Sequence, residues 1–371
     1  MTDRSTTPAK APRLASLDAY RGFVMLLMMA EVLELRAVAK ALPQSRFWGF
    51  LAWHQSHVPW EGCSLHDLIQ PSFSFLVGVA LPFSLAARLA RGQSTGQLTL
   101  HCLWRAFLLV ILGIFLRSVG KPMTNFTFED TLTQIGLGYP LLFLLALRPR
   151  RDAWIALATI LGAVWLAWVT WGGADPWAKN ANLGHAFDVW FLNLFPRPEP
   201  FLENAGGYLT LNFIPTLATS ILGLVAGRWL QDRAPPGRFV IAGIVCLAAG
   251  WALAATGVCP IVKRIWTPAW VLFSGGWCFL LLAAFHQVID VAGRRRWAWP
   301  LEVIGMNSIA AYLIEHLWKQ FIGKALVTHL GVDAFTVFGP EFAPLLRGAA
   351  TLAILWAILW WMQRRGILLR I

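Results

Sequence analysis

The sequence predicts an all-α fold, a single polytopic bundle of about ten membrane-spanning helices. Two observations support this prediction. Of the 371 residues, 57% are hydrophobic and only 13% are charged, and the mean hydropathy is +0.58. A soluble domain carries roughly a quarter charged residues. In addition, apolar runs of roughly 20 residues, long enough to cross the hydrocarbon core, recur along the whole chain.

The predicted spans are joined by short polar connections. We divide the chain into a polar tail, residues 1–16, and one transmembrane domain, residues 17–371, with no internal repeat. The tail lacks the apolar segment and cleavage site of a signal peptide, so we expect the first span to remain as an anchor. The spans are 18–38, 67–90, 101–119, 131–147, 153–171, 210–231, 238–257, 268–290, 302–323 and 345–363.

Basic residues are concentrated in every second connection. By the positive-inside rule these connections and both termini face the cytoplasm. The net charge of +12 then reflects topology and anionic lipids, not nucleic acid. The nearly neutral loops 39–66 and 172–209 would face outward, on the periplasmic or luminal side. The basic groups are Arg4, Lys10 and Arg13; Arg88, Arg91 and Arg105; Arg148, Arg150 and Arg151; Arg228, Arg233 and Arg238; Arg294, Arg295 and Arg296; and Arg364, Arg365 and Arg370.

The segment from His54 to Asp67 is the strongest candidate for a functional site. It places three histidines and two carboxylates directly before an apolar span. Ionisable groups are costly to keep at a membrane helix, so their presence there indicates a functional site. The imidazole of His57 can remove a proton or accept an acyl group; alternatively it bonds loop backbone. Asp67 can orient that imidazole, or complement the dipole at the start of a helix.

The other histidines of this segment are weaker candidates for the site. His54 and His66 are candidates for supporting roles beside His57. A metal site built from His54, His57, His66 and Asp67 fits no standard zinc spacing, so we expect no metal. A disulfide between Cys63 and Cys259 is compatible with their loops, which are predicted to share one face of the membrane.

Several short motifs follow one another between residues 13 and 320. They resemble, in content and order, those of the heparan-α-glucosaminide N-acetyltransferase family, membrane acyltransferases with bacterial homologues of unassigned substrate. The motifs are Arg13-Leu-Ala-Ser-Leu-Asp18-Ala-Tyr-Arg21-Gly-Phe, His57-Val-Pro-Trp60-Glu-Gly62, Asp67-Leu-Ile-Gln-Pro71-Ser-Phe-Ser-Phe75, Trp104-Arg105, Gln134-Ile-Gly136-Leu-Gly-Tyr139, Lys263-Arg-Ile-Trp266-Thr267 and Gly305-Met-Asn307-Ser308.

The resemblance implies transfer of an acetyl group from cytosolic acetyl-CoA to an amino sugar or glycan on the far side of the membrane. The family's catalytic histidine matches His57, and family analogy suggests a homodimer. The chain departs from the family pattern at Ile135, where an arginine is expected, and at Glu31 and Glu34, which make the first span more acidic. These departures leave the acceptor open.

Candidate donor contacts lie in the other motifs. Arg105 can bind CoA phosphates through its guanidinium fork, or can extend from a helix end towards the lipid headgroups. Gln134, Asn307 and Ser308 are candidates for lining the acyl group or pantetheine arm. Their alternative role is hydrogen bonding between helices. Asp18 and Arg21, three residues apart, are expected to pair on one helix face.

Candidate acceptor contacts are Trp60, Glu61 and Trp266. Sugar rings dock on aromatic faces, although tryptophan is also common at membrane interfaces. Glu315 and His316 are ionisable groups within a span, which favours an inward-facing position, and His316 is a candidate second proton carrier.

Two functions of other classes remain open at this point. A proton-coupled sugar or amino-sugar transporter would use Glu31, Glu34 and His57 and would need no CoA. A non-catalytic envelope scaffold would tolerate loss of His57. In each case the expected partners are membrane lipids and a small molecule or glycan, and not nucleic acid.

Overall fold

The computed structural model describes residues 14–369. Residues 1–13 of the predicted tail and Arg370 lie outside this range. Regular structure in the described part is helical, apart from one isolated antiparallel bridge. The α-helices are α1 (Ala15–Met29), α2 (Leu35–Ala41), α3 (Arg46–His54), α4 (Ile69–Leu89), α5 (Thr95–Ser118), α6 (Thr131–Ala146), α7 (Arg150–Trp171), α8 (Leu183–Phe191), α9 (Phe213–Gln231), α10 (Pro236–Ala255), α11 (Pro268–Phe285), α12 (Trp299–Gly305), α13 (Ser308–Leu330) and α14 (Ala343–Arg364).

The all-helical prediction is confirmed for the described residues. Within them, seven helices are long and apolar enough to cross a membrane, α4, α5, α7, α9, α10, α11 and α14 with their flanking turns. The three other predicted spans also contain helices. Of these, α6 has 16 residues, α1 has 15, and α13 contains Glu315, Lys319 and Lys324.

Two of the predicted spans are interrupted. In the predicted span 18–38, the α-helix ends at Met29 and a 3-10 turn follows. The chain then changes direction at Glu34, which adopts a left-handed backbone with φ of 49°. The span 302–323 breaks at Asn307, between α12 and α13. There Asn307 donates from Nδ2 to the Ile367 carbonyl at 3.0 Å and accepts from the Leu369 amide at 3.0 Å. The C-terminal segment is thereby tied to the break.

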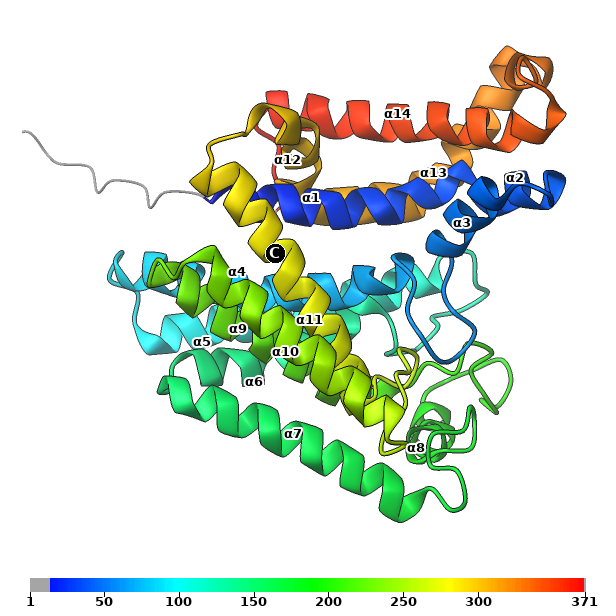
Figure 1. Ribbon diagram of the computed structural model, residues 1–371. Helices are drawn as coiled ribbons and strands as arrows, with labels where there is room; N and C mark the ends of the chain where they lie inside the picture. Colours follow the sequence, from blue (N-terminus) through cyan, green and yellow to red (C-terminus); the bar gives the residue numbers. More distant parts are fainter. Residues whose placement is uncertain (1–13, 370–371) are drawn as a thin grey trace, which may run out of the picture.

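The helices alternate in direction, so the connections gather at two ends of the bundle (Figure 1). We call one the site end: it carries α2, α3 and α8, on the right in Figure 1, and loops 55–65, 119–130, 172–209 and 256–267. The opposite, basic end carries connections 90–94, 147–149, 232–235 and 292–298. The alternation agrees with the predicted sharing of faces. Which end faces the cytoplasm stays a prediction.

The centre of the bundle is formed by α4, α9 and α11, and the other helices surround it. In the apolar stretch of α9, 83% of the residues are buried inside the protein, compared with 17% in the peripheral helix α10. Because α10 is nonetheless highly apolar, its exposed side chains Ile241, Ile244, Val245 and Trp251 form the kind of surface that a bilayer covers.

Small residues allow α4 and α9 to cross at very short distance. A Cβ at Gly78 would lie 1.9 Å from the Ser220 carbonyl oxygen, and one at Gly223 would lie 1.9 Å from the Phe75 carbonyl oxygen. Only glycine permits this approach, which is a common device in membrane helix pairs. The crossing holds α4, which directly follows the turn that carries Asp67, against the centre of the bundle.

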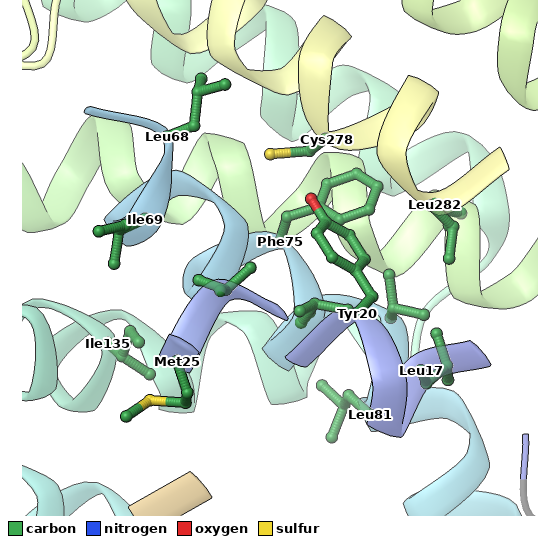
Figure 2. Packing of buried hydrophobic residues seen from close by; sticks show 14 of the residues in the cluster. Leu17, Tyr20, Met25, Leu68, Ile69, Phe75, Leu81, Ile135, Cys278 and Leu282 are labelled. Atoms are coloured by element: carbon green, nitrogen blue, oxygen red, sulfur yellow. The ribbon is translucent and has the colours of Figure 1, made fainter. Parts of the chain in front are cut away.

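A second contact fixes α1 against α4 and α11 (Figure 2). The Tyr20 ring stacks on Phe285 with centroids 5.4 Å apart, and its hydroxyl donates to Ser72 Oγ at 3.0 Å. Ser72 also contacts Cys278 Sγ at 3.7 Å. All five cysteines are free thiols, so the disulfide considered between Cys63 and Cys259 is not formed.

Candidate active site

The loop that carries His57 is shaped by a glycine and by pairing with a distant segment. Gly62 has φ of 108°, in the region that favours glycine. Its amide donates to the Ile261 carbonyl at 3.0 Å, and Glu61 forms the isolated bridge with Val262. This pairing brings the next residue, Lys263, to His57 from more than 200 positions away in the sequence.

His57, Asp67 and Lys263 form a compact polar cluster. His57 Nδ1 lies 2.8 Å from Asp67 Oδ1, and Lys263 Nζ lies 3.1 Å from the same nitrogen and 3.3 Å from Asp67 Oδ1. A protonated Nδ1 donating to Asp67 is the tautomer that satisfies the carboxylate, and Lys263 then pairs with Asp67. The nitrogen left free for chemistry is Nε2.

Asp67 is held rigidly in the 3-10 turn η2 (His66–Leu68), just before α4. Its Oδ2 accepts hydrogen bonds from the Val58 amide at 3.2 Å and from the Ser64 amide and hydroxyl, both at 3.0 Å. With only 1% of its side chain exposed, this carboxylate is fully partnered. It therefore orients His57 as the acid of a catalytic triad orients its imidazole.

The environment favours the neutral form of His57. Burial lowers its pKa, and the charge of Lys263 lowers it further, while the bond to Asp67 acts in the opposite direction. Burial also lowers the pKa of Lys263, partly offset by the charge of Asp67. A neutral imidazole is the form needed in a general base or nucleophile.

A cavity of about 320 Å³ opens beside this cluster, and we call it the site cavity. It is lined by His57, Lys263 and His66, by Tyr208 from the long loop, and by charged groups of α13. The His57 and His66 rings lie 4.6 Å apart between centroids. The α13 groups are Glu315, His316 and Lys319. The predicted inward position is confirmed for Glu315, whose side chain is 1% exposed, whereas His316 lines the cavity with 36% of its side chain exposed.

A second cavity of about 390 Å³ lies towards the basic end, and we call it the basic cavity. Four basic side chains line it: Arg21, Arg88, His101 and Arg105. Arg105 donates to the Tyr139 hydroxyl at 3.1 Å, but its buried Nε has no hydrogen-bond partner in the described part of the chain. A buried donor without a partner is costly, and an anionic ligand would satisfy it.

The two cavities adjoin inside the bundle. Phe73 of α4, Thr131 of α6 and Tyr312 of α13 line both of them. The lining therefore continues from the arginines of the basic end to His57. This arrangement suits an elongated ligand with anionic groups at one end and its reacting group at the other.

Comparison with known proteins finds two N-acetyltransferases. The chain is 23% identical to the heparan-alpha-glucosaminide N-acetyltransferase of Mus musculus over 380 aligned residues, covering 85% of the chain, and 23% identical to that of Homo sapiens over 374, covering 84%. The chain is a distant relative of these N-acetyltransferases. It spans about half the length of each, 55% and 54%. No protein-family model matches it.

Some residues that the resemblance to the N-acetyltransferases singled out line neither cavity. Gln134 is buried and donates from Nε2 to the Phe128 carbonyl at 2.6 Å, and Asn307 bonds the C-terminal segment. Trp266 is 1% exposed and donates to Thr219 Oγ1 at 3.2 Å. These contacts hold backbone and helices in place. Of the four predicted donor residues, Arg105 and Ser308 line the basic cavity.

The acceptor candidates Trp60 and Glu61 lie beside the cluster and outside the cavity lining. Trp60 packs against Gly207 of the long loop, and Glu61 is part of the bridge to Val262. His54 accepts from the Leu65 amide at 3.2 Å and supports the loop. Within residues 14–369, no group of three or more His, Cys, Asp or Glu side chains is arranged to hold a metal ion.

The residue that sequence reasoning missed is Lys263. Its motif was recognised, but the lysine was not assigned to the site, although a lysine just before an apolar span is a usable signal. Arg21, Arg88 and His101 were likewise not assigned to the donor end. Their convergence depends on the packing of α1, α4 and α5, which no local pattern reports.

Proposed function

We propose that the protein transfers an acetyl group from acetyl-CoA to an amino sugar or glycan, with His57 at the reacting centre. The observation that carries this proposal is the meeting of the two cavities at Phe73, Thr131 and Tyr312. The distant relationship to N-acetyltransferases supports acetyl-CoA as the donor.

The basic cavity fits the charged part of this donor. CoA carries several phosphate charges, and arginine binds phosphate oxygens in a bidentate manner. The basic cavity supplies cationic and donor groups from Arg21, Arg88, His101 and Arg105. The unpartnered Nε of Arg105 can donate a hydrogen bond to a phosphate oxygen. We assign this end to the cytoplasmic face of a bacterial inner membrane, by the positive-inside rule, and the His57 loop to the periplasmic face.

The chemistry then takes place at the site end. The pantetheine arm extends past Ser308 to the junction, and the thioester reaches His57. With Nδ1–H held by Asp67, Nε2 removes a proton from the acceptor amine while that amine attacks the thioester carbon. Alternatively, Nε2 first takes the acetyl group and passes it on. Both routes break the C–S bond, release CoA thiol, and benefit from a cavity that keeps water from the thioester.

The test uses purified protein in nanodiscs with radiolabelled acetyl-CoA and a panel of amino sugars. We expect labelled product from the wild type, loss of at least about a hundredfold in His57→Ala, and full activity in His185→Ala, a matched change in α8 at the same end. Absence of both acetyl-CoA binding and transfer in folded wild-type protein would contradict the proposal.

The same adjoining cavities would also serve a sugar or amino-sugar transporter, with Glu31 and His57 as proton-coupling groups. That function predicts accumulation of labelled sugar in proteoliposomes under a proton gradient, without CoA. Uptake without acetylation would therefore favour transport over acetyl transfer. The predicted homodimer is a separate proposal that light scattering of the nanodisc-free protein would test.

A further inference from the structure

Acetyl transfer to an amine has a proton requirement that the His57–Asp67 pair does not meet. When an acceptor ammonium becomes an amide, a C–N bond forms, the thioester C–S bond breaks, and the nitrogen loses two protons. One proton completes the CoA thiol, and the other leaves the site. Asp67 offers no exit, because both of its oxygens are already partnered and it is 1% exposed.

A second path begins on the other side of His57. The His66 ring lies against the His57 ring, with centroids 4.6 Å apart, and His66 Nε2 lies 3.0 Å from Glu31 Oε1. The side chains of His57, His66 and Glu31 are 37%, 7% and 41% exposed, so the buried His66 links two partly exposed groups. The three groups therefore run from the reacting centre to an open surface.

That surface is a groove of about 690 Å³ between η1 (Ala30–Leu33), α13 and α14, which we call the side groove. Glu31 and Lys319 line both the side groove and the site cavity. Other polar groups of the groove are Glu34, Lys324 and Arg347. A proton that reaches Glu31 can therefore pass to solvent in the side groove.

We propose that His66 and Glu31 conduct the released proton from His57 to the side groove. This proposal rests on the proposed acetyl transfer. The His57 and His66 rings share no direct hydrogen bond, so one water in the polar site cavity bridges them, as such sites permit. His66 takes the proton on one ring nitrogen and passes the proton of Nε2 to Glu31 Oε1. Glu31 then releases the proton to water in the side groove, and His66 returns to its starting tautomer by proton exchange with water before the next turnover.

Charged groups surround this path on every side. On the His57 side they are Asp67 and Lys263. On α13, Lys319 Nζ lies 3.7 Å from Glu31 Oε2 and is also paired with Glu315, and His316 contacts Glu315 at 2.8 Å. Lys319 is thereby shared between the carboxylates of Glu31 and Glu315.

The chain offers a matched control for this path. Glu34 also lines the side groove, but it pairs with Arg347 at 3.1 Å and is not among the partners of His66. We therefore compare Glu31→Gln and His66→Gln with Glu34→Gln, using acetyl-CoA and glucosamine at pH 7. Each change keeps the size of the side chain or nearly so.

The decisive readout is rescue by diffusible buffer. At low buffer concentration we expect kcat to fall about tenfold or more in Glu31→Gln and His66→Gln, and to recover as imidazole is added. Glu34→Gln should stay within twofold of the wild type, about the scatter of such assays. A residue with only a packing role would not be rescued, so unchanged rates, or losses that no buffer restores, would overturn the relay.

A second measurement does not depend on catalysis. Removing the Glu31 carboxylate takes away the acceptor that lies 3.0 Å from His66 Nε2 and leaves this nitrogen more accessible. Site-resolved modification by diethyl pyrocarbonate at pH 6 should therefore proceed faster at His66 in Glu31→Gln, and at the wild-type rate in Glu34→Gln. Equal rates in all three proteins would overturn the pairing. Faster modification in Glu31→Gln, together with no acetyl transfer by the wild type, would overturn the proposed function and with it the role of the relay.

Discussion

The two cavities differ in how far their polar groups are already satisfied. At the site end, Asp67 accepts from three donors at one oxygen and contacts His57 and Lys263 at the other. In the basic cavity, Arg105 keeps a buried Nε without a partner in the described residues. A preorganised cluster suits chemistry, because its geometry needs no rearrangement during reaction. An arginine with an unpartnered buried nitrogen suits binding, because an anion can accept its hydrogen bond. Variants at the two ends should therefore affect different kinetic constants.

The largest effect is expected from Asp67→Asn at the site end. The amide cannot hold the protonated Nδ1 of His57 as the carboxylate does, so kcat should fall about a thousandfold. The affinity for acetyl-CoA, measured by calorimetry, should be unchanged. Asp333→Asn, an exposed aspartate at the same end, serves as the control. Equal losses in both variants would remove Asp67 from the site.

Thr131→Trp tests whether the two cavities act as one path. The indole would fill the junction where Thr131 lines both cavities, and the thioester would no longer reach His57. Misplacement of a reacting group by about 1 Å can cost a hundredfold, so we expect at least that loss in kcat. Binding of CoA itself should persist. Normal turnover would mean that the donor reaches His57 by another route.

Arg105→Ala, at the basic end, should weaken donor binding and leave the chemical step unchanged. Loss of one charge-assisted contact costs about 1.5–3 kcal/mol, so KM for acetyl-CoA should rise at least about tenfold. The value of kcat should change little. The control is Arg151→Ala, an arginine at the same end with 82% of its side chain exposed. A fall in kcat at saturating donor would contradict a role confined to binding.

Lys263→Met should give the smallest effect, a displacement of the pH profile. His57 acts in its neutral form, so activity falls as the pH decreases through the pKa of His57. Burial lowers that pKa, and the Lys263 charge lowers it further. Removing the charge therefore moves the acid limb of kcat to higher pH. Lys121→Met, in a loop at the same end, should leave the limb in place. A shift to lower pH would contradict the assigned cause.

The distinction between the two ends was only partly visible in the sequence. His57 and Asp67 are ten residues apart in a recognisable motif, and the structure brings them together. Arg105 and Ser308 were also predicted for the donor end and line the basic cavity. Gln134, Asn307 and Trp266 share motifs with them but bond to backbone or to neighbouring helices. A motif therefore does not separate a side chain that faces a ligand from one that holds the scaffold.

The sequence by itself determined where the long apolar helices lie and which end of the bundle is basic, because hydropathy and charge act locally and add up along each segment. It did not place α3 and α8, which lie in segments predicted as loops. Tertiary structure decided the breaks at Glu34 and Asn307, the approach of Lys263 to His57, and the meeting of two cavities. The physical reason is that these features depend on contacts between segments far apart in the chain. Their energies come from close packing and from satisfying individual buried polar groups, and neither quantity is a property of a local stretch of sequence.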